Sequence, residues 1–198
     1  MSATARLRPA GPPAASVRPG SGGVGRSTSA AAERVSDDLR RGSGDFLEQR
    51  RWIAGLGTLA AGALGVVALY QFGLLRRVPE PPLPLLHDAA DAVDASGEAY
   101  QAFKTPDAAL GLVSAGATLV LAGIGDRQRA RTTPWVPLAL AAKTAVDAAG
   151  SGFLLAEQLT KHRSLCSWCT VAALAQVATL PLALPEARVA LHTWRCRR

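Results

Sequence analysis

The stretch "SLCSWCTVAALAQVATLPLALPEA", residues 164–187, places a pair of cysteines at the start of a long apolar run. Cys166 and Cys169 are three positions apart, and residues 165–185 contain no charged side chain. At about 1.5 Å per residue, a helix of that length crosses the ~30 Å hydrocarbon core of a bilayer. The stretch therefore predicts a transmembrane helix that begins with a dithiol.

Three further apolar runs precede this one, and only the third contains charged residues, Lys143 and Asp147. A helix on the surface of a soluble bundle would show a polar face with a 3.6-residue period. The other runs show none, and their many Gly and Ala residues suit close helix packing in lipid. The sequence therefore predicts an all-α membrane protein, a four-helix transmembrane bundle. Its expected spans are about 52–75, 108–125, 134–156 and 165–185.

The remaining segments are polar or charged. Residues 1–33 are rich in Ala, Pro, Gly, Ser and Arg, which predicts a disordered basic tail without a secretory signal peptide. The charged residues 34–51 predict a short juxtamembrane helix. Pro181 and Pro185 are expected to end the fourth helix, which leaves residues 188–198 as a cytoplasmic tail.

The distribution of basic residues predicts the orientation in the membrane. With both termini in the cytoplasm, sixteen Lys and Arg lie on that side and five on the other, as the positive-inside rule requires. The loop of residues 76–107 and the dithiol are then exterior. The net charge is +7, but no lysine-rich helix or basic face with interspersed aromatics occurs, so we expect no nucleic-acid partner. One cysteine pair and a lone Cys196 also give no four-ligand metal site.

The dithiol has the features of a redox site. In a C-x-x-C the two side chains lie on adjacent turns of a helix, within reach of disulfide formation. A helix start near Ser164, preceded by Lys161 and Arg163, favours the thiolate form. The alternative is that both cysteines serve as small apolar residues in a membrane helix.

The motif "SLCSWCTVAALA", the four spans and the long loop between the first two resemble the vitamin K epoxide reductase family over roughly residues 50–187. The resemblance implies that the C-x-x-C reduces a membrane quinone, of ubiquinone or menaquinone type. It also implies re-reduction by a thioredoxin-like exterior thiol protein. By the same resemblance Cys169 faces the quinone and Cys166 exchanges disulfides.

Three departures from the family pattern concern this chemistry. Residues 76–107 contain no cysteine, where the family commonly has a second pair that shuttles electrons. The span 108–125 has no Asn, and Ala173 stands where better-known members have a quinone-binding Tyr. A thiol partner would then have to attack Cys166 directly.

Lys143 and Trp168 are further candidates for quinone binding. An ionisable group deep in a span is costly and usually paired, so Lys143 either donates to a quinone carbonyl or forms a structural ion pair with Asp147. Trp168 either stacks on the quinone ring or anchors the helix at the membrane interface. Lone polar residues in the spans, such as Gln71 and Gln176, are expected to hydrogen-bond between helices.

The function predicted from the sequence is a quinone-linked thiol–disulfide oxidoreductase in the inner cell membrane, with Cys166 and Cys169 as its redox pair. Two alternatives remain open. One is a non-catalytic membrane scaffold or subunit that has lost the quinone site. The other is a metal or electron carrier that completes its ligand set from a partner chain.

Overall fold

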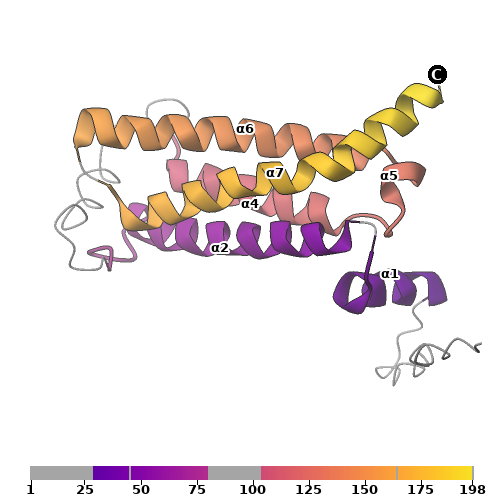
Figure 1. Cartoon of the computed structure of the whole chain (residues 1–198). Coiled ribbons are helices and arrows are strands. Elements are labelled where there is room, and N and C mark those ends of the chain that lie inside the picture. Colours follow the sequence, from indigo (N-terminus) through magenta and orange to yellow (C-terminus); the bar gives the residue numbers. More distant parts are fainter. Residues whose placement is uncertain (1–28, 45, 80–103, 164, 198) are drawn as a thin grey trace, which may run out of the picture.

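The computed structural model describes residues 29–44, 46–79, 104–163 and 165–197, and within these ranges it contains helices and no strands. Four long helices lie side by side (Figure 1). They are α2 (Leu47–Gln71), α4 (Asp107–Gly123), α6 (Trp135–Glu157) and α7 (Ser167–Cys196). We call the end of the bundle that carries Cys166 the dithiol end and the opposite one the arginine end.

Three of these helices are long and apolar enough to cross a membrane, namely α2, α6 with its continuation to Lys161, and α7. The fourth, α4, has 17 residues and is therefore only about 25 Å long. The prediction of an all-α membrane bundle is confirmed, with one helix shorter than the other three.

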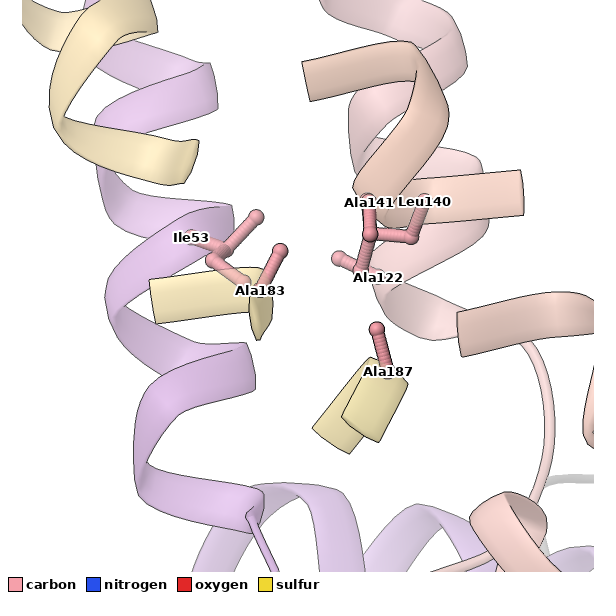
Figure 2. Packing of buried hydrophobic residues seen from close by; sticks show 6 residues of the cluster. All are labelled: Ile53, Ala122, Leu140, Ala141, Ala183 and Ala187. Carbon is pink, nitrogen blue, oxygen red and sulfur yellow. The ribbon is translucent and has the colours of Figure 1, made fainter. Parts of the chain in front are cut away.

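The bundle packs through small side chains. Helix α2 lies between α4 and α7, α6 packs along α7, and the contact between α4 and α6 is much slighter. One buried cluster draws on all four helices, and Figure 2 shows its six residues converging: Ile53, Ala122, Leu140, Ala141, Ala183 and Ala187. Alanine dominates this cluster because backbones that approach closely leave little room for larger side chains.

Two shorter helices lie near the arginine end (Figure 1): α1 (Ala30–Arg41) and α5 (Arg129–Thr132). Helix α1 begins where Ser29 Oγ accepts a hydrogen bond from the Ala32 N–H. The Arg51 guanidinium donates to the carbonyls of Asp38, Leu39 and Gly42 and so ties the end of α1 to α2.

Two predictions for the N-terminal part are therefore wrong. Residues 30–33, expected to be disordered, belong to α1, because the cap at Ser29 starts a helix there. The charged segment 34–51 is not one juxtamembrane helix, because Gly42 ends α1 and α2 already begins at Leu47. The rest of the predicted tail, residues 1–28, lies outside the described residues, as does Ser164, near which the sequence predicts a helix start.

The prediction that Pro181 and Pro185 end the fourth helix is also wrong, because α7 continues through both to Cys196. A proline inside a helix removes one backbone hydrogen bond. Here tertiary contacts outweigh that loss, since Ala183, Glu186 and Ala190 on the same segment are buried. The predicted cytoplasmic tail of residues 188–198 is accordingly helical as far as Cys196.

Side chains of α2 hold both ends of α4. At the dithiol end, Gln71 Nε2 donates to Asp107 Oδ1 at 2.6 Å, and Gln71 Oε1 accepts from the Ala108 N–H at 3.2 Å. At the arginine end, Arg50 donates to backbone carbonyls of the last turn of α4 and the turn after it. These belong to Ala122, Gly123, Ile124, Gly125 and Asp126, at 2.9–3.3 Å. The expected interhelical role of Gln71 is confirmed.

Arg129 completes this arrangement and connects it to α7. Its Nε and Nη2 atoms each donate at 2.7 Å to one oxygen of Glu186, and Nη1 donates to the Leu121 and Ile124 carbonyls at 2.7 Å. Arg129 is fully buried, and Arg50 and Glu186 are each 2% exposed. This buried arginine cluster, Arg50, Arg129 and Glu186, joins α2, α4, α5 and α7 at one point.

We expect Arg129→Met to destabilise the bundle strongly, because it leaves the Glu186 carboxylate buried and unpaired. Breaking a buried pair by removing one partner costs about 3–5 kcal/mol. Thermal unfolding in detergent, followed by tryptophan fluorescence, measures the loss. The matched control is Arg127→Met, which removes an exposed arginine of the same loop and should leave the unfolding temperature unchanged. Equal effects of the two changes would contradict a special role for Arg129.

Candidate active site: the dithiol at the start of α7

The backbone between α6 and α7 presents Cys166 as the first capping residue of α7. After the π-helical turn η2 (Gln158–His162), Arg163 adopts a left-handed conformation with φ 51°. Cys166 is then the N-cap of α7, and its Sγ accepts from the Cys169 N–H at 3.3 Å. Its carbonyl accepts from the Thr170 N–H at 2.9 Å, so the dithiol lies in the first turn, where backbone N–H groups lack helical partners.

The two sulfur-bearing residues differ in accessibility. Cys166 is fully buried, whereas Cys169 is half-buried. Cys166 belongs to a buried cluster with residues of α2, α4 and the segment after α2, namely Val67, Ala68, Val78 and Ala108. Cys169, Trp168, Tyr70 and Val66 pack against this cluster. Among the described residues, the neighbours in this cluster are apolar, and Tyr70 and Trp168 add aromatic side chains.

A turn at the end of α2 brings Val78 to this cluster. Gly73 has φ 76°, and its N–H bonds to the Tyr70 carbonyl at 2.8 Å, while the Leu74 N–H bonds to the Leu69 carbonyl at 2.9 Å. This is the Schellman arrangement, which satisfies the last carbonyls of a helix and favours glycine at the left-handed position. Beyond it, Val78 is 9% exposed, and the Pro79 carbonyl accepts from Trp168 Nε1 at 2.8 Å.

Trp168 thus has a role that the sequence did not indicate. It packs against the buried cluster of Cys166 and against a second cluster of small residues deeper in the bundle, which includes Ala63 and Ala172. Its indole N–H holds the segment that follows α2. Stacking of Trp168 on a quinone stays a prediction.

Lys143 lies apart from the dithiol. Its ammonium donates to Ser114 Oγ at 2.9 Å and Thr118 Oγ1 at 2.7 Å on α4, and also to Asp147 and to the Ser114 carbonyl. Along α4, Ser114 is six residues, about 9 Å, from Ala108, which shares the cluster of Cys166.

This polar group therefore bridges α4 and α6, whose packing is otherwise slight. Three N–H bonds are the full donor capacity of a lysine ammonium, so donation to a quinone would require Lys143 to give up one of these acceptors. Asp147 in turn accepts from Ser114 Oγ at 2.8 Å. The geometry favours the structural ion pair of the two roles considered for Lys143.

Sequence reasoning missed two residues at the site, Tyr70 and Val78. Tyr70 is one position before Gln71, near the end of the first span, and nothing in its spacing relates it to the cysteines 96 positions later. Val78 lies within a proline-containing loop stretch. In the sequence, the one indication that the chain turns back at the end of this span was Gly73, seven residues after Val66.

Comparison with known families decides the classification. The model of the vitamin K epoxide reductase family matches residues 51–184, which is more than half of the chain. The chain belongs to this family. Neither the curated proteins nor the solved structures gave a match. The family consists of membrane thiol oxidoreductases that normally use a quinone, and this member is accordingly a membrane protein in contact with lipid.

The described residues around the dithiol fit the flat, apolar ring of a quinone in part. Val66, Tyr70, Trp168 and the half-buried Cys169 all pack against the buried cluster that contains Cys166. The Asn and Tyr through which better-known members bind the quinone carbonyls are absent, and Lys143 is engaged elsewhere. The fit is therefore in apolar and aromatic character.

We expect Lys143→Met to lower stability and to leave thiol-to-quinone electron transfer unchanged, because the ammonium bridges α4 and α6 away from the cysteines. Removing one partner of a largely buried pair costs about 3–5 kcal/mol. The double change Lys143→Met, Asp147→Leu should recover part of this loss, since no unpaired charge remains. Unfolding temperature and initial transfer rate are measured on the same preparations. A large fall in rate with an unchanged unfolding temperature would instead assign Lys143 to the quinone.

Proposed function

We propose that this chain is a membrane thiol–disulfide oxidoreductase that passes electrons between thiols of an exterior protein and a membrane quinone. Cys166 and Cys169 are its redox pair. The observation that carries the proposal is the position of this pair in the first turn of α7, at the boundary between the end of the bundle and its apolar interior. A thiol protein in water and an acceptor dissolved in lipid can both approach that boundary.

The exchange balances in electrons and protons. A partner thiolate attacks Sγ of Cys166 in the Cys166–Cys169 disulfide, the S–S bond breaks, and Cys169 leaves as a thiolate. The second thiol of the partner then displaces Cys166, which leaves the partner oxidised and the pair reduced. Re-oxidation of the pair delivers two electrons and two protons, which convert one quinone to a hydroquinone.

The proposed orientation places the dithiol end outside and both termini in the cytoplasm of a cell with an inner membrane. The excess of Lys and Arg on the other side supports it. The exterior compartment would supply a thioredoxin-like partner, since disulfide exchange proceeds there.

One observation favours a second candidate, a non-catalytic bundle. Residues 76–107 contain no cysteine, so the chain lacks the pair that usually carries electrons to the C-x-x-C in this family. The oxidoreductase therefore requires a partner thiol to reach Cys166 without an intermediate. The two candidates differ in one measurable property, the response of the dithiol to quinone.

The experiment follows the redox state of the pair in proteoliposomes of the full chain. The protein is reduced, freed of reductant and supplied with a short-chain ubiquinone or menaquinone. We expect the Cys166–Cys169 disulfide to re-form within minutes, as seen by alkylation and mass shift. Cys169→Ser should abolish this, because a single thiol cannot close the bond.

The matched control is Cys196→Ser, which removes the exposed cysteine at the arginine end and should leave re-oxidation unchanged. Thiols that stay reduced with either quinone would favour the non-catalytic bundle. Re-oxidation at the same rate without quinone would show that oxygen, rather than a quinone, is the acceptor.

A further inference from the structure

In the proposed exchange the partner thiol attacks Sγ of Cys166 first, yet Cys166 is less accessible than Cys169. Cys166 is fully buried, and Cys169, three residues further into the helix, is half-buried. A helix that begins at the membrane boundary would ordinarily expose its N-cap residue more than a residue in its first turn. Something outside α7 must therefore cover Cys166.

The segment after α2 provides part of this cover. Val78 is 9% exposed and belongs to the same buried cluster as Cys166. The Schellman turn at Gly73 reverses the chain so that residues 74–78 return toward the helix ends. Within this described segment, a hydrogen bond from Trp168 Nε1 to the Pro79 carbonyl at 2.8 Å ties the chain to α7.

We infer that Trp168 is a positioning residue that holds Val78 and Pro79 over Cys166 and so controls how fast a thiol reaches that sulfur. We call this contact the Trp168 latch. Trp168 lies between the two cysteines in sequence, and its side chain packs against the cluster that encloses Cys166. The inference deepens the proposed function, because it specifies how the thiol partner gains access.

The latch is suited to opening. Pro79 is exposed, so water competes for the Pro79 carbonyl and for the indole N–H. A hydrogen bond of this kind contributes a net factor of about two to ten to an equilibrium. A docking partner that donates to the Pro79 carbonyl could therefore displace Trp168 and uncover Cys166 in the same step.

This arrangement also separates the two half-reactions. With the latch closed, a thiol from the aqueous side cannot approach Cys166, while Cys169 remains half-buried against the same cluster. Rates of thiol–disulfide exchange depend on which sulfur is attacked and on access to it. The latch thereby protects the pair from small thiols and reserves Cys166 for a partner that binds.

The experiment measures alkylation of each sulfur in the reduced full chain in detergent, and it needs neither quinone nor partner. Cys166 alone is followed in the background Cys169→Ser, Cys196→Ser, and Cys169 alone in Cys166→Ser, Cys196→Ser. N-ethylmaleimide is the probe. Trp168→Phe removes the indole N–H and keeps an aromatic ring, so it opens the latch with little loss of packing.

We expect Trp168→Phe to raise the alkylation rate of Cys166 about two- to tenfold and to leave that of Cys169 unchanged. Pro79→Gly keeps the acceptor carbonyl but loosens the segment, and it should raise the Cys166 rate in the same direction. Trp135→Phe, an exposed tryptophan at the arginine end, is the matched control and should change neither rate.

An unchanged Cys166 rate in Trp168→Phe would overturn the inference. So would equal increases at both sulfurs, which would mean that the start of α7 unfolds. A second readout is the reduction of the Cys166–Cys169 disulfide by dithiothreitol in otherwise unaltered chains, which Trp168→Phe should accelerate.

These results are independent of electron transfer. If Trp168→Phe raises the alkylation rate of Cys166 but the dithiol never responds to quinone, the control of access is supported and the proposed function is rejected. A quinone response with no effect of Trp168→Phe would do the reverse.

Discussion

Where α4 finishes, at the arginine end of the bundle, its last backbone carbonyls have no N–H donor within the helix. Two buried arginines supply the missing donors. In a membrane an unsatisfied carbonyl costs several kcal/mol, and a 17-residue helix ends too early to reach water freely. Arg50 brings donors from α2, and Arg129 brings donors and the partner Glu186 on α7. The long helices α2, α4 and α7 are thereby fixed at one point together with α5, and the direction of α7 from there determines where its first turn, with the dithiol, lies.

The apolar runs predicted which parts of the chain form the bundle, because membrane helices must be both long and apolar. Their ends were harder to predict. Arg50 and Arg51 looked like juxtamembrane charge, yet both lie inside α2, where their guanidiniums satisfy carbonyls of α4 and α1. Pro181 and Pro185 were expected to end the helix because each proline removes one backbone hydrogen bond. The packing that compensates for this loss cannot be read from the sequence.

At the site, the sequence predicted that Cys166 and Cys169 lie close together at the start of a helix, and the structure places Cys166 at the N-cap of α7 and Cys169 in its first turn. The burial of Cys166 was not predictable, because it depends on Val78, which is distant in sequence and returns only through the turn at Gly73. Likewise, a lone lysine in a span indicates that a partner exists. It does not reveal that Ser114 and Thr118 on another helix share the ammonium with Asp147.

Helix α2 carries both caps of α4, Gln71 at one end and Arg50 at the other. The distance between these two side chains along α2 therefore acts as a template for the length and register of α4. Both helices belong to the first two thirds of the chain, so this hairpin can assemble on the ribosome before α7 has been synthesised. Glu186 lies on α7, the last of these helices to be synthesised, so its pairing with Arg129 can form only after the hairpin of α2 and α4 is complete in the chain.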